Sequence, residues 1–480
     1  MIIARKIAYN VAISSLSKVL STALALVSIA FITRYLGKEG FGNYATVLAF
    51  LSFFAALADL GLYSISTREI SKSGADGKKI MGNVFAMRLA SSLLIVLAAP
   101  LIVLFFPYPP AVKAGIVVVA LSFVFSSGYQ VLNGIFQKNL AMDKVAVAEL
   151  AGKIFQVAIV IGAVKFNLGF QWIVFALFFN MLISFLVVFL WSKKYLRFHI
   201  QFDFSYWKKF LRESAPIGVA SVITFAYFKM DTIMLSVMKN SADVGIYNAA
   251  SKVLENITFF PAMIIGLIFP LMAKNIFTDK ETFQQISNKT FKVFIILVVP
   301  LVIGVFFLSD GIIRVIGGGG FAEATVVLRI LVFALALIFF GNFFNSVLIA
   351  GNRQKLLMLI LGMAAVINIS LNLIFIPQFS YLGAAYISVL TEFLVVTMGF
   401  YATVKKIGYF PKTEKITGIL AAGGSMALFL FLFKQSNFIF LLLISSVIYF
   451  LLLWLLRVIK TEEIMSLISK KGIQEYGESS

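Results

Sequence analysis

Twelve ionisable side chains lie inside stretches of sequence that are otherwise apolar and long enough to span a membrane. Seven are basic and five are acidic: Lys18, Arg34, Asp59, Arg88, Glu149, Lys153, Lys229, Asp231, Lys252, Glu255, Arg329 and Glu392. A charged side chain near the centre of a spanning helix costs ~2.5–3.5 kcal/mol on insertion scales. We therefore expect these side chains to face one another or a hydrated internal cavity, not lipid.

Three of the bases share one depth in the first half of the chain. With a helical rise of about 1.5 Å per residue, Lys18, Arg88 and Lys153 lie roughly 10–12 Å in from the same end of their helices. An excess of positive charge suits an anionic head group such as a phosphate or pyrophosphate, and arginine adds bidentate geometry. These three residues, with Lys229 nearer the middle of the second half, are the candidate ligands of such a group.

Asp59 lies at a similar depth to the three bases, and this permits a structural alternative in which it pairs with Arg88 or Lys18 and locks the helices together. Asp59, Asp231 and Glu392 are also candidate acids for coupling transport to H⁺ or Na⁺, because ionisable groups within spans commonly mark ion pathways.

Two further sets of charges can neutralise themselves on one helix. Glu149 and Lys153 are four residues apart, and Lys252 and Glu255 are three apart, so each pair can form a local ion pair. We interpret Glu149, Lys252 and Glu255 as structural.

The composition indicates a polytopic membrane protein. The 480 residues are 61% hydrophobic and 13% charged, whereas soluble domains are about half apolar and about a quarter charged. A single soluble core stops growing near ~250–300 residues, so it cannot hide this much apolar surface. Spanning segments of this length must be helical, because lipid-facing backbone has to satisfy its own hydrogen bonds. The expected fold class is therefore an all-α integral membrane protein.

The residue counts also exclude several kinds of chemistry. The chain has no cysteine and one histidine, His199, so disulfides, zinc-thiolate sites, iron–sulfur clusters and cysteine nucleophiles are excluded. We expect no metal, no catalytic residue and no cofactor other than a possible coupling ion.

Fourteen segments have the length and polarity of spanning helices, given that a span needs about 20 mostly apolar residues. They are 12–35, 42–66, 81–106, 112–136, 145–166, 170–192, 214–238, 245–271, 291–309, 325–349, 356–376, 380–404, 416–434 and 438–456.

The loops between these segments alternate in charge. With the N-terminus placed inside, 28 Lys and Arg residues fall in cytoplasmic loops and tails and six in the opposite loops. Membrane proteins concentrate these residues on the cytoplasmic side, so both termini are expected in the cytoplasm. The net charge of +20 thus reflects topology, and nucleic acid is not an expected partner.

Short motifs recur in order along the two halves. Gly42-Asn-Tyr44 opens a span as Gly245-Ile-Tyr247 does. Leu168-Gly169 precedes the sixth span, and Leu382-Gly383 lies at the start of the twelfth. The repeat predicts two six-helix lobes, 1–204 and 205–410, with two extra helices and a cytoplasmic tail in 411–480. Transporter repeats of this kind place the substrate site at their interface.

The segment 205–213 has apolar side chains on one face and basic side chains on the other, which is typical of a helix lying at the membrane surface. It is expected to lead the second lobe.

The ordered motifs resemble a known family. The segments 17–45, 58–69, 244–252, 269–272 and 320–331 are similar to polysaccharide transporters, the Wzx-type flippases of the multidrug/oligosaccharidyl-lipid/polysaccharide (MOP) exporter superfamily. The resemblance extends over about residues 8–455. It implies a two-lobed, V-shaped bundle that moves lipid-linked sugars across the inner membrane by alternating access.

The resemblance, together with the charges, predicts a flippase for a polyprenyl-(pyro)phosphate-linked oligosaccharide. Its partners would be that substrate and membrane lipids. A monomer is compatible with the sequence, which leaves the oligomeric state open. No nucleotide-binding motif is present, and no enzymatic activity is expected.

Three alternatives stay open. A cation-coupled multidrug exporter belongs to the same superfamily, although such exporters favour twelve helices and acidic cavities. A flippase for a lipid-linked peptidoglycan precursor shares the fourteen helices and the cationic cavity. A membrane polysaccharide polymerase or ligase is an alternative of another class, but it would typically have a sizeable outer loop, whereas the outer loops here are short.

Overall fold

The computed structural model describes residues 2–59, 61–72 and 74–459, and this part of the chain is helical with no strand. The helices are α1 (Ile2–Asp59), α2 (Leu62–Ile70), α3 (Gly77–Leu104), α4 (Pro110–Lys138), α5 (Met142–Lys165), α6 (Phe170–Ser192), α7 (Phe204–Met238), α8 (Ser241–Ile257), α9 (Phe259–Asn275), α10 (Lys280–Gly317), the 3₁₀ helix η1 (Gly318–Phe321), α11 (Ala324–Ala350), α12 (Gln354–Ile407), α13 (Ile416–Leu432) and α14 (Phe438–Leu455). The predicted all-α membrane class is confirmed.

Eleven helical stretches within the described residues are long and apolar enough to cross a membrane, and the shorter apolar helix α13 adds a twelfth segment. The count of fourteen spans is not confirmed as such. The difference arises because α1 and α12 each contain two of the predicted segments across a single non-helical residue, Gly37 in α1 and Ser380 in α12.

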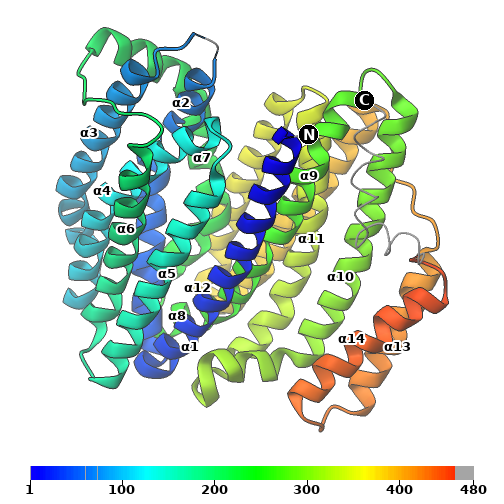
Figure 1. Cartoon of the computed structure of the whole chain (residues 1–480). Helices are drawn as coiled ribbons and strands as arrows, with labels where there is room; N and C mark the ends of the chain where they lie inside the picture. The colour runs from blue at the N-terminus through cyan, green and yellow to red at the C-terminus, as the bar shows by residue number, and fades with distance from the viewer. Residues whose placement is uncertain (1, 60, 73, 460–480) are drawn as a thin grey trace. The chain divides into compact units, whose positions relative to one another are not determined.

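The break in α1 turns the chain back on itself. Gly37 adopts φ 65° and ψ −171°, a left-handed φ that glycine adopts without steric cost. In Figure 1, α1 descends from the N-terminus, reverses at the bottom and ascends towards α2. The boundary predicted between the first two spans, within 36–41, contains this break at Gly37.

Contacts divide the chain into two compact units. The first unit comprises Met1–Ala249, Val315–Phe321 and Leu361–Ile387, and the second comprises Ala250–Arg314, Ala322–Ile360 and Ser388–Ser480. The predicted tail beyond residue 459 lies outside the described residues.

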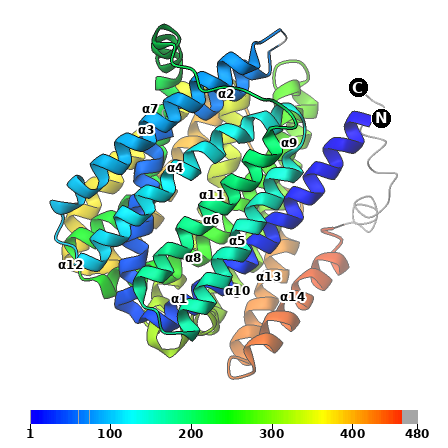
Figure 2. The ribbon, with the colours of Figure 1, turned by 60° about the vertical axis from the view of Figure 1, so that its left-hand side comes forward.

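The first unit is built around α3–α6, with α4 against both α3 and α6 and α5 against α6 and α1. Figure 2 shows α4, α6 and α5 side by side. Close approach between α5 and α6 depends on Gly152, because a Cβ there would overlap the side chain of Ser184. One core cluster in this unit is buried between α2, α3 and α4 and contains Met81, Val84 and Leu132.

The second unit has its own core. Helix α9 packs on α11, and α13 packs on α14. Fully buried rings on α10 and α11, Phe294 and Phe339, meet edge to face at 5.6 Å between centroids, a favourable aromatic geometry. The hydroxyl of Tyr449 in α14 donates to the carbonyl of Ile296 at 2.9 Å and joins α14 to α10.

The segment 193–203 joins α6 to α7 as an extended strap. It is fastened to α3 by Asn83, whose Oδ1 accepts from the backbone N–H of Asp203 at 2.9 Å and from Nε1 of Trp207 at 3.1 Å. The predicted surface helix over 205–213 forms the first turns of α7. That helix continues to Met238, with Pro216 inside it.

Candidate functional site

Arg88 and Asp59, two residues predicted at one depth, form an ion pair in the first unit. Arg88 Nη2 binds Asp59 Oδ1 and also donates to Gln130 Oε1 at 3.2 Å, while Nη1 donates to the carbonyl of Ala58 at 3.3 Å. The arginine side chain is 1% exposed. Three helices thus converge on one guanidinium.

This arrangement matches the structural alternative for Arg88. Both terminal nitrogens of its guanidinium bind protein groups, and a buried ion pair is costly to break because the remaining charge is left uncompensated. The pair fixes the C-terminal end of α1 to α3 and α4, close to where α2 begins.

Lys18 lies exposed on α1. Among the described residues, no hydrogen bond or ion pair links it to Asp59 or Arg88. The two bases expected at one level are therefore in different environments, one exposed and the other buried.

Lys153 on α5 belongs to a polar group shared with α6. Its Nζ donates to Gln156 Oε1 at 3.0 Å, and the same oxygen accepts from Asn180 Nδ2 at 2.7 Å. Glu149, one turn earlier and exposed, accepts from the hydroxyl of Tyr129 on α4 at 2.9 Å. The charge pattern of the sequence does not reveal these neutral partners, because amides and a tyrosine carry no formal charge at neutral pH.

Asp231 on α7 is the most enclosed of the predicted acids in the first unit, with 6% of the residue exposed. Its Oδ2 accepts from the hydroxyl of Tyr247 on α8 at 3.0 Å, and its Oδ1 accepts from Asn372 Nδ2 on α12 at 2.7 Å. Lys229, half-buried, precedes it by two residues on the same helix. Three helices of the unit therefore meet at one carboxylate.

Two asparagines extend the environment of Asp231. Asn372 Nδ2 also donates to Asn368 Oδ1 at 3.0 Å, and Asn372 Oδ1 is buried without a hydrogen-bond partner among the described residues. The spacing of four residues places both amides on one face of α12, a signal readable in an apolar segment. The carboxylate of Asp231 and the acceptor oxygen of Asn372, which binds no hydrogen-bond donor among the described residues, could together hold a proton or a small cation.

The remaining predicted residues lie in the second unit. Lys252 Nζ is 2.7 Å from Glu255 Oε2, so these two residues form the local ion pair that their spacing favours. Glu392 on α12 is buried, with 7% exposed.

Fold and site together define an α-helical, multi-pass membrane protein with charged groups held between its helices. A family model described as polysaccharide biosynthesis protein matches residues 7–276, which is more than half of the chain. The chain belongs to this family, so the family resemblance seen in the sequence is confirmed.

Individual proteins extend the comparison. The probable low-salt glycan biosynthesis flippase Agl15 of Haloferax volcanii is 24% identical over 382 residues, which cover 78% of this chain and 79% of that protein. The structure of the lipid II flippase MurJ in an inward closed conformation has a TM-score of 0.74 at 17% identity, covering 92% of this chain and 97% of the other.

A second solved structure shares the fold. An inward-facing multidrug resistance MATE transporter of the MOP superfamily has a TM-score of 0.66 at 13% identity, covering 83% of this chain and 98% of that one. At these identities the two structures establish the fold alone, and the function has to be argued from the site and the family.

Proposed function

We propose that the protein is a flippase that moves a polyprenyl-phosphate- or pyrophosphate-linked oligosaccharide across the cytoplasmic membrane for surface polysaccharide biosynthesis. Membership of the polysaccharide biosynthesis family carries the proposal, and the similarity to a glycan biosynthesis flippase supports it. In this proposal the lipid tail stays in the bilayer while the head group crosses in a polar passage.

The anionic head group is assigned to lysines. Lys18 is exposed, and Lys153 and Lys229 are half-buried, so their ammonium groups lie at or near accessible surface. A lysine ammonium is a mobile point charge that can bind a phosphate and release it. Arg88 takes a positioning role instead, because protein groups bind both terminal nitrogens of its guanidinium and the side chain is buried.

Asp231 is the proposed coupling residue for H⁺ or Na⁺. Its carboxylate oxygens accept hydrogen bonds from groups on other helices, Tyr247 on α8 and Asn372 on α12. Protonation or cation binding at this carboxylate would change the balance of those bonds and so the packing of α7 against α8 and α12. Coupling of this kind supplies the free-energy difference between two states of an alternating-access cycle.

The proposed orientation has both termini in the cytoplasm. The charge count carries it, with 28 Lys and Arg in loops and tails on one side and six on the other. Under this orientation the strap 193–203 lies at the cytoplasmic ends of α6 and α7.

A second candidate is a flippase for a lipid-linked peptidoglycan precursor. The cationic residues Lys18, Lys153 and Lys229 favour it over the multidrug exporter, because a lipid-linked precursor with a pyrophosphate is anionic. The two flippase functions share a lipid pyrophosphate carrier and differ in the sugar, so only the substrate separates them.

The test is transport in vesicles that contain the purified protein and a fluorescent polyprenyl-pyrophosphate oligosaccharide. We expect protein-dependent transfer between leaflets, read as loss of protection from an impermeant quencher. Lys18→Ala and Lys153→Ala are expected to slow transfer, whereas Lys434→Ala, in an exposed loop, is the matched control.

Two outcomes decide between the functions. Transfer of lipid II, without transfer of the oligosaccharide lipid, would establish the second candidate. Transfer of the oligosaccharide lipid that is unchanged in both lysine variants would overturn the cationic head-group site while leaving the flippase activity standing.

A further inference from the structure

A cavity of about 720 Å³ lies in the first unit, next to the strap. Its walls come from α3, α4 and α6, and its rim comes from the end of α6 and the strap. Its volume falls within the roughly 300–1,000 Å³ that is usual for small-molecule sites. It is separate from the charged pairs described above, since Arg88, although on α3, is not among its lining residues.

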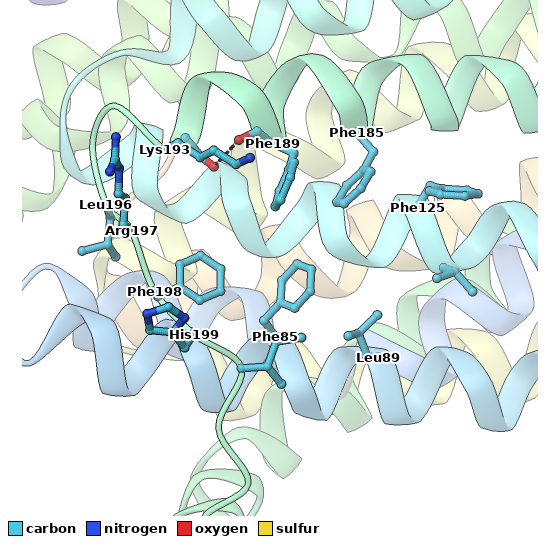
Figure 3. Close-up of a pocket in the computed structure, with 13 residues that line it drawn as sticks. Phe85, Leu89, Phe125, Phe185, Phe189, Lys193, Leu196, Arg197, Phe198 and His199 are labelled. Carbon is cyan, nitrogen blue, oxygen red and sulfur yellow. Dashed lines mark hydrogen bonds between the residues drawn. The ribbon is translucent and has the colours of Figure 1, made fainter.

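The walls of the cavity are aromatic. Figure 3 shows the rings of Phe185 and Phe189 on one side, facing Phe85 and Leu89 on the other. Phe185 stacks on Phe189 at 5.6 Å between centroids. Such a slot accepts a hydrocarbon chain through close van der Waals contacts with the rings; the chain is already out of water in the bilayer, so packing and not the hydrophobic effect holds it.

A glycine keeps the slot open. A Cβ at Gly128 on α4 would lie 2.7 Å from a ring carbon of Phe185 and 3.4 Å from one of Phe85. Any larger residue at this position would push the Phe185 ring from its place. The open aromatic walls thus depend on the absence of a single side chain.

The rim of the cavity is basic. Lys193, Arg197 and His199 line it and are exposed, and Figure 3 places them together at the same end of the slot. Among the 13 lining residues, all within the described part of the chain, none is acidic. An anionic group at this rim would meet positive charge without a competing carboxylate.

The strap holds the rim in position. Gln201 N–H donates to the carbonyl of Gly82 at 3.3 Å, and Asn83 binds the backbone of Asp203. The ring of Phe198 packs against Phe85 at 5.7 Å between centroids. The three basic side chains are therefore presented from backbone that runs from the end of α6 to these contacts with α3.

We propose that this cavity binds one anionic membrane phospholipid, with a hydrocarbon chain between the phenylalanine walls and the phosphate at Lys193, Arg197 and His199. Basic pockets between spanning helices, on the side where positive residues gather, are known to select anionic head groups. A zwitterionic lipid of equal chain length gains the apolar contacts but not the charge interaction. The site is independent of the transported substrate.

The test measures lipid binding to the purified full-length protein by native mass spectrometry, with phosphatidylglycerol and phosphatidylcholine of identical chains. We expect tighter binding of phosphatidylglycerol. A basic residue at an anionic lipid contributes roughly fivefold in affinity, so Lys193→Gln with Arg197→Gln should weaken phosphatidylglycerol binding by about 25-fold. The matched control is Lys208→Gln with Lys209→Gln, which removes the same charge from exposed positions on α7 that do not line the cavity.

A second pair of variants tests the slot itself. Gly128→Leu should weaken the binding of both lipids, and Leu89→Trp, which fills the slot from the opposite wall, serves if the first variant does not fold. Equal affinity for the two lipids, or an equal loss in the control, would overturn the proposal. Displacement of phosphatidylglycerol by a tighter-binding polyprenyl phosphate would also overturn it, by assigning the cavity to the transported carrier.

Discussion

Gly42 in α1 and Gly245 in α8 pack against each other's helices in a reciprocal way. A Cβ on Gly42 would overlap the carbonyl oxygen of Ser241, and a Cβ on Gly245 would overlap that of Lys38. Each glycine thus faces the carbonyl four residues before the other. The repeated Gly-x-Tyr motif in the sequence marks a contact between its own two copies.

This contact predicts that a single methyl group at either glycine destabilises the protein. Gly42→Ala and Gly245→Ala should each cost about 1–3 kcal/mol, the usual range for overpacking, because the atom in the way is backbone. The measurement is the free energy of unfolding in detergent. Gly162→Ala is the control, since nothing lies within 4 Å of a Cβ there and the helix should be unchanged or slightly more stable. Equal effects at all three positions would contradict the packing.

The Arg88–Asp59 pair predicts that neutralising one partner is worse than neutralising both. Arg88→Met or Asp59→Leu alone should destabilise by about 3–5 kcal/mol, because each leaves one charge uncompensated. The double variant should recover most of that loss. A double-mutant cycle on unfolding measures it. If Arg88→Met kept its stability but lost transport, the residue would be a substrate ligand and the positioning role would be wrong.

Asp231 predicts a loss of ion coupling that leaves the fold intact. Asp231→Asn keeps the shape of the side chain and one acceptor oxygen, so the fold should be unaffected. The amide cannot take up a proton and carries no charge to hold a cation, so transport driven by an H⁺ or Na⁺ gradient should fall at least about tenfold. Tyr247→Phe, which removes one hydrogen bond to the carboxylate, should have an intermediate effect. The control is Asp310→Asn, an exposed acid on α10. Gradient-driven transport equal to that of the wild type in Asp231→Asn would exclude this carboxylate from coupling.

The hydrogen bond and ion pair of Asp203 predict that the thermal stability of the protein falls at low pH. The backbone N–H of Tyr206, and then the ammonium of Lys79 at 3.2 Å, lower the pKa of this carboxyl from its usual 3.8. A lowered folded-state pKa means that the stabilisation is present above pH ~4 and is lost as the pH falls through the folded pKa. The wild type should therefore exceed Asp203→Asn in thermal stability at pH 7, and the difference should shrink below pH ~4. A difference that does not change with pH would contradict this linkage.

The depth of a charged residue along its spanning helix could be predicted from the sequence, but the residues next to it on other helices could not. A fixed rise per residue placed Asp59 and Arg88 at one level, and they do meet. The same arithmetic grouped Lys18 with them, although it lies exposed on α1. Which face of a helix meets which neighbour depends on packing along the whole length, and the charge pattern contains no information on that.

Neutral partners were the other gap. Gln130, Asn372 and Tyr247 complete the environments of Arg88 and Asp231, but they carry no formal charge, so a search for opposite charges at one depth does not find them. The merged helices have a simpler cause. Gly37 and Ser380 each turn the chain with one residue, so two predicted spans follow each other without a loop between them.

The hydrogen bonds of Asn83 have a consequence for which residues of this protein can be substituted during evolution. A neutral amide holds the strap through hydrogen bonds to Asp203, Trp207 and Gln201, and none of the basic rim residues takes part in them. Lys193, Arg197 and His199 are thus free to be exchanged for other residues without loosening the loop. Homologous proteins in membranes of different lipid content could therefore differ in the charge of this rim by single substitutions, while the strap kept its conformation.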